Sequence, residues 1–255
     1  MNPISLFIFF STLLIYNYRK LFFSYIELIP QETQRAQWLR SNRFLLGIIT
    51  LSSVFGIFIS VFSLSFKTLV LVLPLFLVSV LYATPFSKNK NSPKRLRHLP
   101  FLKLFLVAGV WTMVTVLLPE FEVNAAQLES KSTVFTCLTR FLFIFAITLP
   151  FDIRDMEVDR KNNIKTFPVI LGVEKTIRLA VAILLLFIVA YVYSQFAGDK
   201  TNAYKAAAYI LSGLISIAFI LQVPKQKSEY FVSVGIEGLM LIQFLLLFLF
   251  HHFIA

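Results

Sequence analysis

Long apolar runs constrain the fold of this 255-residue chain more than any other feature. Eight stretches are each about long enough to cross the hydrocarbon core of a bilayer, which takes roughly 20 residues as a helix. None of them alternates with a period of two, as the strands of a membrane β-barrel do. The sequence therefore predicts an all-α, polytopic transmembrane helix bundle with about eight spans. The predicted spans are residues 3–23, 44–64, 68–84, 100–119, 132–151, 176–197, 203–223 and 230–253.

The amino-acid composition also indicates a membrane protein. Hydrophobic residues make up 58% of the chain and charged residues only 15%, whereas a soluble domain is about a quarter charged. The single cysteine, Cys137, lies in an apolar run, so no disulfide framework is implied. A lipid bilayer is the expected surrounding of this chain.

The net charge of +11 has a topological explanation. Nineteen of the 24 Lys and Arg residues fall in alternate gaps between spans, and four fall in the other gaps. The positive-inside rule produces such an alternation, so the basic gaps are predicted to be cytoplasmic and no nucleic-acid partner is expected. The basic gaps hold five such residues in 19–43, six in 85–103, six in 152–178 and two in 224–229.

No internal repeat or domain boundary is evident, and residues 1–255 are predicted to form one membrane-embedded helical domain. Residues 24–43 and 85–99 are its expected cytoplasmic loops, and both chain ends are expected outside. The apolar N-terminus has no basic region before it, so it is interpreted as a span rather than a signal peptide. The expected location is the cytoplasmic (inner) membrane of a bacterium, with the active face toward the cytoplasm.

An unusual concentration of charge follows the fifth predicted span. Asp152, Asp155 and Asp159 are spaced i, i+3 and i+7, so on a helix they project within a sector of roughly 60° and over about 10 Å. Arg154 and Glu157 are expected on other faces. Three like charges on one stripe repel each other unless a cation lies between them. Carboxylates at this spacing suit Mg²⁺, which keeps several waters and shares a phosphate.

Other polar residues are candidates for the same site. Arg160 and Lys165 follow the aspartates and can hold the charge of a phosphate. Glu237 in the last predicted span is a candidate polar contact, and Arg140 inside the fifth span is expected to have a structural partner. The alternative interpretation of the three aspartates is a solvated helix end at the membrane surface.

Three segments of the chain resemble the UbiA superfamily of membrane prenyltransferases. Residues 152–160 resemble its second aspartate-rich motif, and residues 165–172 (Lys-Thr-Phe-Pro-Val-Ile-Leu-Gly) resemble the segment after it. Residues 82–85 (Tyr-Ala-Thr-Pro), a basic loop and residues 99–103 (Leu-Pro-Phe-Leu-Lys) resemble the family's central cytoplasmic loop and next helix. The resemblance covers about residues 40–255.

This resemblance implies transfer of a polyprenyl group from its diphosphate to a small lipophilic acceptor, expected to be aromatic. It implies that Asp152, Asp155 and Asp159 are catalytic and hold Mg²⁺ against the diphosphate. Bases of the 88–97 loop are expected to neutralise the departing phosphates. The other residues expected to bind substrate are Lys165, Arg160, Asn17, Arg19, Lys103 and Glu237.

The chain departs from the family pattern near its start. The family carries an earlier motif of the form Asn-Asp-x-x-Asp-x-x-x-Asp, and residues 16–21 here read Tyr-Asn-Tyr-Arg-Lys-Leu. Asn17 remains, but no carboxylate does, and Arg19 and Lys20 bring positive charge. The family also has nine helices, whereas eight are predicted here.

Two hypotheses follow from this departure. Either Arg19 and Lys20 take over phosphate charge in an active enzyme with one metal ion, or the chain is a catalytically impaired relative that binds an isoprenoid lipid or a membrane partner. A transporter is a weaker alternative because the acids lie at a helix end rather than at the membrane midplane. The Asp-Gly and Ala-Arg pattern of CDP-alcohol phosphotransferases is absent.

Overall fold

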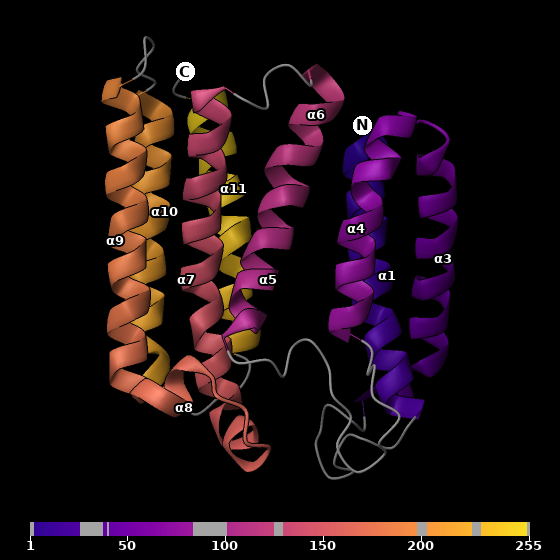
Figure 1. The fold of residues 1–255 in the computed structure, drawn as a ribbon, viewed down its shortest axis with the longest axis horizontal. Coiled ribbons are helices and arrows are strands. Elements are labelled where there is room, and N and C mark those ends of the chain that lie inside the picture. The colour runs from indigo at the N-terminus through magenta and orange to yellow at the C-terminus, as the bar shows by residue number, and fades with distance from the viewer. Residues whose placement is uncertain are drawn as a thin grey trace. The chain divides into compact units, whose positions relative to one another are not determined.

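The structure is a computed structural model that describes residues 3–25, 38–39, 41–83, 101–124, 130–197, 203–225 and 231–253. Within these ranges every regular element is a helix (Figure 1). Six described helices are long and apolar enough to cross a membrane, and two shorter apolar helices, Pro3–Asn17 and Phe66–Tyr82, accompany them. The predicted all-α membrane bundle is confirmed, whereas a count of eight spans is not established.

The chain divides into two compact units, which are described separately. The prediction that residues 1–255 form one domain stays a prediction. The described helices of the first unit are α1 (Pro3–Tyr25), α3 (Arg43–Val61), α4 (Phe66–Ala83) and α6 (Leu118–Asn124). Those of the second unit are α5 (Leu102–Thr112), η2 (Met113–Leu117), α7 (Lys131–Lys161), α8 (Phe167–Leu171), α9 (Val173–Ala197), α10 (Ala203–Gln222), η4 (Val223–Lys225), η5 (Phe231–Ile236) and α11 (Glu237–Phe253).

In the first unit α1 packs along α3 through a seam of small residues. Ser53, Gly56 and Ser60 recur on one buried face of α3, as small residues do where membrane helices approach closely. A Cβ atom placed on Gly56 would overlap the ring of Phe10 on α1. The absence of a side chain at Gly56 therefore permits this approach.

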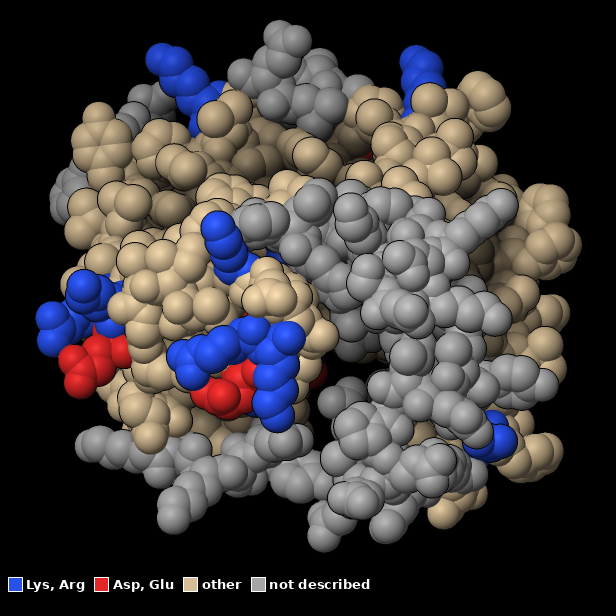
Figure 2. Space-filling model, turned by 60° about the horizontal axis from the view of Figure 1, so that its bottom comes forward, with Lys and Arg blue, Asp and Glu red and all other residues tan. Residues whose placement is uncertain are grey.

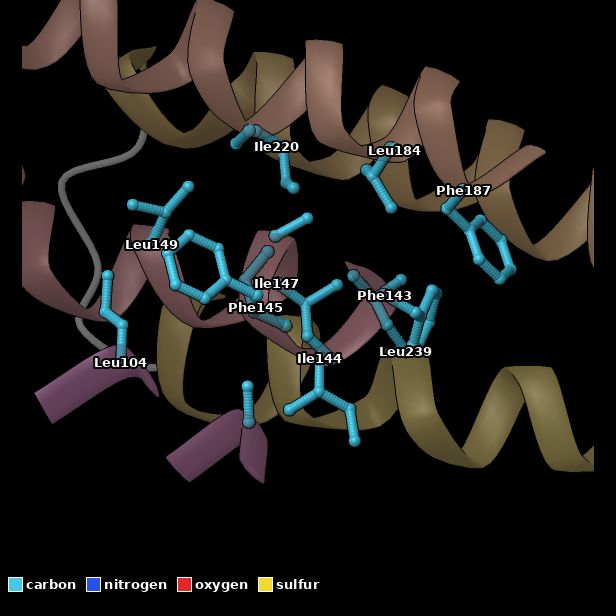
Figure 3. Close-up of a cluster of buried hydrophobic side chains, with 14 of the residues drawn as sticks. Leu104, Phe143, Ile144, Phe145, Ile147, Leu149, Leu184, Phe187, Ile220 and Leu239 are labelled. Atoms are coloured by element: carbon cyan, nitrogen blue, oxygen red, sulfur yellow. The ribbon is translucent and has the colours of Figure 1, made fainter. Parts of the chain in front are cut away.

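The second unit is built around α7. This helix packs against α5, α9, α10 and η5, and its eight consecutive residues 143–150 are all buried. A helix that is apolar all round is the buried centre of its bundle. Figure 3 shows side chains of α5, α9, α10 and α11 converging on this stretch. The labelled residues are Leu104, Phe143, Ile144, Phe145, Ile147, Leu149, Leu184, Phe187, Ile220 and Leu239.

Arg140 brings a charge into this apolar interior and has a partner there, as expected. Its Nη1 donates to Gln243 Oε1 of α11 at 2.5 Å, and Gln243 Nε2 donates to Ser212 Oγ of α10 at 3.3 Å. Gln243 is only 1% exposed. None of the ion pairs among the described residues involves Arg140. The guanidinium thus links α7 to α11 and α10 through neutral groups, which suits a polar side chain in a membrane bundle.

The close approach of α1 and α3 predicts unequal effects of alanine at two glycines of α3. Gly56→Ala should destabilise the protein by about 1–3 kcal/mol, because the new Cβ forces the Phe10 ring to move. Gly47→Ala should be neutral or stabilising by roughly 0.5–1 kcal/mol, because nothing lies within 4 Å of that Cβ. Thermal unfolding of both variants in detergent micelles measures the difference, and equal effects would contradict the packing described.

The Arg140 link predicts a rescue. Gln243→Leu should cost about 1–3 kcal/mol of unfolding free energy, because the guanidinium keeps its charge and loses its acceptor. The double variant Arg140→Met/Gln243→Leu should recover most of that loss, because both polar partners are then replaced by apolar groups. Unfolding midpoints of the single and double variants decide this. A double variant that is less stable than Gln243→Leu would show that Arg140 has another role.

Candidate functional site

The three aspartates lie on the last third of α7, which continues as a helix to Lys161, past the predicted end of the span at residue 151. The helix ends in a Schellman motif: Asn163 N–H donates to Arg160 O at 3.2 Å and Ile164 N–H to Asp159 O at 2.9 Å. Asn163 has a left-handed φ of 55°, which asparagine tolerates better than most residues. The turn fixes where the acidic helix stops.

Asp152 is the most enclosed member of the site. Its side chain is 2% exposed, and its Oδ1 accepts a hydrogen bond from Lys103 Nζ of α5 at 2.6 Å. The same Nζ lies 3.7 Å from Asp155 Oδ2. Two carboxylates of α7 therefore share one ammonium group of α5. The resemblance pointed to Lys103, but the residues between positions 103 and 152 gave no indication of this pairing.

Asp155 is held by a second cation, Arg154. The guanidinium donates from Nε to Oδ1 at 2.8 Å and from Nη2 to Oδ2 at 3.2 Å, and Nη1 donates to Ser233 Oγ of η5 at 2.9 Å. The expectation that Arg154 points to another face was wrong, because its long side chain curls back to the neighbouring carboxylate. Ser233 was missed altogether, since a serine in an apolar run carries no signal of such a contact.

The residues after Asp155 continue along α7 to its end at Lys161. Asp159 is buried, and Glu157 pairs with Arg160 at 3.2 Å on the exposed side of α7. Lys165 is exposed, and within the described residues it forms no ion pair. Thr166 Oγ1 is buried, and among the described residues it has no hydrogen-bond partner. Figure 2 shows mixed groups of basic and acidic side chains on this end of the molecule.

A series of phenyl rings lies behind the ionic cluster. Phe141, Phe145 and Asp152 fall on one stripe of α7, since they are spaced by four and seven residues. Ring centroids in this series are 4.7–6.2 Å apart, a spacing typical of interacting aromatic pairs. Its five rings belong to Phe101, Phe105, Phe141, Phe145 and Phe167. One stripe therefore offers charge at the helix end and an apolar, aromatic surface farther in.

Phe101 ties the start of α5 to the segment that follows the aspartates. It precedes α5 with a left-handed φ of 59°, which is unusual for a bulky residue. Its ring centroid lies 4.7 Å from that of Phe167 in an edge-on contact. This contact positions the first turn of α5, and with it Lys103.

The remaining predicted residues belong to other segments of the chain. Asn17 is buried on α1 in the first unit, where its Nδ2 donates to Leu13 O of the same helix at 2.9 Å. Arg19 lies on α1, but its side chain is outside the described residues, as is the whole 88–97 loop. Glu237 is exposed at the start of α11. Their roles toward a substrate stay predictions.

The donor groups can be compared with what Mg²⁺ requires. Among the described residues no group of three or more His, Cys, Asp or Glu side chains is placed to hold a metal ion. Asp152 and Asp155 nevertheless converge on one cation, the ammonium of Lys103. Magnesium is usually bound by one or two carboxylates together with water and phosphate oxygens. These two aspartates fit that requirement, with the ammonium standing where a metal would share them.

Comparisons with known proteins agree with this architecture. One solved structure, a UbiA homolog from Archaeoglobus fulgidus bound to DMAPP and Mg²⁺, has a TM-score of 0.58 at 11% identity, over 98% of this chain and 87% of that one. Another, from work on digeranylgeranylglyceryl phosphate synthase in membranes, has a TM-score of 0.54 at 16% identity, over 97% and 84%. At such identities the likeness concerns the fold. No curated protein matches the sequence.

A family model gives the assignment independently of the fold. The model of the UbiA prenyltransferase family matches residues 38–250, which is most of the chain. The match includes the aspartate helix and Lys103 but not α1. This chain belongs to the UbiA prenyltransferase family.

Proposed function

We propose that this protein is a membrane prenyltransferase that moves an isoprenoid group from its diphosphate to a small aromatic acceptor, with Mg²⁺ as cofactor. Family membership supports a prenyltransferase-type activity, and the Archaeoglobus relative of the same fold is described with DMAPP and Mg²⁺. We place the metal on Asp152 and Asp155. Asp159, one turn farther along α7, is the proposed third carboxylate.

The observation that carries the proposal is the stripe of α7 on which charge and aromatic rings follow one another. Four charged groups, Lys103, Asp152, Arg154 and Asp155, interact at the end of an otherwise apolar bundle. Ionisable residues in such a place are costly and mark function by default. An isoprenoid diphosphate has the same two parts, a charged head and an apolar tail.

The reaction needs stabilisation of negative charge at the diphosphate and exclusion of water around the prenyl group. The bond between prenyl C1 and the diphosphate oxygen breaks, and its electron pair leaves with the diphosphate. A new bond then joins C1 to a ring carbon of the acceptor, and that carbon loses a proton. Lys103 and Arg154 supply positive charge beside the leaving group. Bound Mg²⁺ would neutralise further negative charge there.

The apolar part of the second unit excludes water from the prenyl group. The buried residues of α7 next to the aromatic series keep water from an allylic cation. Phenyl faces such as those of Phe141 and Phe145 stabilise positive charge through cation–π attraction. Lys165 and Arg160, both exposed at the same end, are proposed to meet the diphosphate from outside. We place this end at the cytoplasmic face of a bacterial inner membrane, because the basic gaps lie there.

A specific observation favours a second candidate, a relative that binds an isoprenoid lipid or a membrane partner without turnover. Residues 16–21 contain no carboxylate. The carboxylates that the family's earlier motif would add to the metal site are therefore absent from this segment. This candidate predicts that an isoprenoid lipid co-purifies with a protein that releases no diphosphate.

Release of diphosphate from farnesyl and geranylgeranyl diphosphate, with Mg²⁺ and protein in nanodiscs, separates the two candidates. Asp155→Asn should lower the release rate by about 100-fold or more, because the leaving group then loses a preorganised charge partner. Glu174→Gln is the control, since it removes a carboxylate of α9 that is 87% exposed and pairs with Arg178, outside the proposed site; its rate should match wild type.

The outcomes are exclusive. Unchanged release by Asp155→Asn would overturn the assignment of the aspartate helix as the active site. No release by folded wild-type protein with either chain length would favour the binding relative.

A further inference from the structure

We propose that Lys103 is a built-in competitor of the metal: its ammonium holds Asp152 and Asp155 and keeps a divalent cation off them until a diphosphate arrives. This inference rests on the proposed function and concerns how that site is regulated. It makes metal binding depend on the substrate rather than precede it.

The Lys103 ammonium lies between the two carboxylates. Lys103 Nζ lies 2.6 Å from Asp152 Oδ1 and 3.7 Å from Asp155 Oδ2, so it occupies the position from which both carboxylates are reached. The side chain of Lys103 is 19% exposed and that of Asp152 is 2% exposed. A metal ion cannot share these two carboxylates while the ammonium remains between them.

The charges around Asp152 and Asp155 also oppose the binding of a metal ion by itself. Among the described residues, the carboxylates of Asp152 and Asp155 are already paired with two cations, Lys103 and Arg154. A divalent ion added beside these two cations would bring further positive charge into a partly buried place, which is costly. Binding of the metal therefore requires that one of the cations leaves or that negative charge is added.

Lys103 is better suited to leave than Arg154. The Arg154 guanidinium donates two hydrogen bonds to Asp155 and a third to Ser233 on another helical segment. A planar guanidinium engaged at three points is fixed, whereas an ammonium on a four-carbon stem changes partners readily. The exchange is therefore assigned to Lys103.

The position of Lys103 in α5 also favours its exchange from the carboxylates to a diphosphate. It is the second residue of α5, an 11-residue helix with no acidic residue in its first turn. A cation there opposes the helix dipole, whereas an anion is favoured. A diphosphate beside this turn would attract the Lys103 ammonium away from the carboxylates and add the negative charge that a divalent ion requires. Metal and diphosphate would then bind together.

Binding of Mn²⁺ alone tests this without catalysis. Mn²⁺ prefers the same oxygen ligands as Mg²⁺, and its electron paramagnetic resonance signal reports the free ion. In the absence of diphosphate, Lys103→Met should bind Mn²⁺ about tenfold tighter or more than wild type, because a competing charge within 4 Å of both carboxylates is gone. Lys103→Gln should show the same gain, and Lys103→Arg should not.

The matched control is Lys161→Met, which removes an exposed lysine at the end of the same helix as the aspartates. It measures the effect of lowering the net charge by one. Equal affinities of wild type and Lys103→Met would overturn the proposal, and so would a gain of the same size in Lys161→Met.

A wild-type arm keeps the test decisive if the variants do not fold. In equilibrium dialysis, wild-type protein should retain Mn²⁺ at least tenfold better with an unreactive farnesyl thiolodiphosphate than without it, after correction for binding of Mn²⁺ to the free thiolodiphosphate. Equal retention would overturn the proposal. Diphosphate release with no effect of Lys103 on Mn²⁺ would leave the enzyme assignment intact and end this inference. An effect of Lys103 on Mn²⁺ binding without any diphosphate release would support this inference and contradict the enzyme assignment.

Discussion

Three charged side chains of α7 in the second unit have partners on neighbouring helices. Arg140 reaches Gln243 on α11, Asp152 reaches Lys103 on α5, and Arg154 reaches Ser233 on η5. A polar or charged group that is buried without a complementary partner is costly, so a helix that carries such groups depends on partners from the same bundle. The arrangement of α5 and α11 around α7 depends on these contacts as well as on apolar packing.

The contacts that satisfy these charges also form the candidate functional site. The ion pairs that make the charges of α7 tolerable also gather two carboxylates and two cations within reach of one another. The aromatic series behind them is part of the same apolar packing that buries residues 143–150. Stability and proposed function therefore draw on the same side chains, and α7 is the helix on which both depend.

The helices were predictable because each one is specified by a local stretch of the sequence. An apolar run of bilayer length specifies a span without reference to its neighbours, and the aspartate spacing specified a helix face. The predicted span ended at residue 151 because hydropathy falls there, whereas the helix continues to Lys161. The helix ends at Lys161, and the left-handed backbone of Asn163 closes the Schellman turn after it.

The pairing within the site was not predictable from spacing. Lys103 and Asp152 are 49 positions apart, and Arg154 and Ser233 are 79, so no periodicity relates them. Arg154 was placed on another face by its Cα direction, but a long side chain can turn through the angle between adjacent positions. Glu237 follows a π-helical segment, which shifts the faces of every later residue relative to those before it.

That π-helical segment, η5, has a consequence for how this protein can vary in length. α7 is attached to the last helix at two points, Ser233 within η5 and Gln243 beyond it in α11. A π turn holds one more residue than an α turn, so it sets the angular phase between the two points. Loss of one residue between them would rotate one point by about 100° relative to the other. We therefore expect an insertion or deletion between Ser233 and Gln243 to break one of the two contacts.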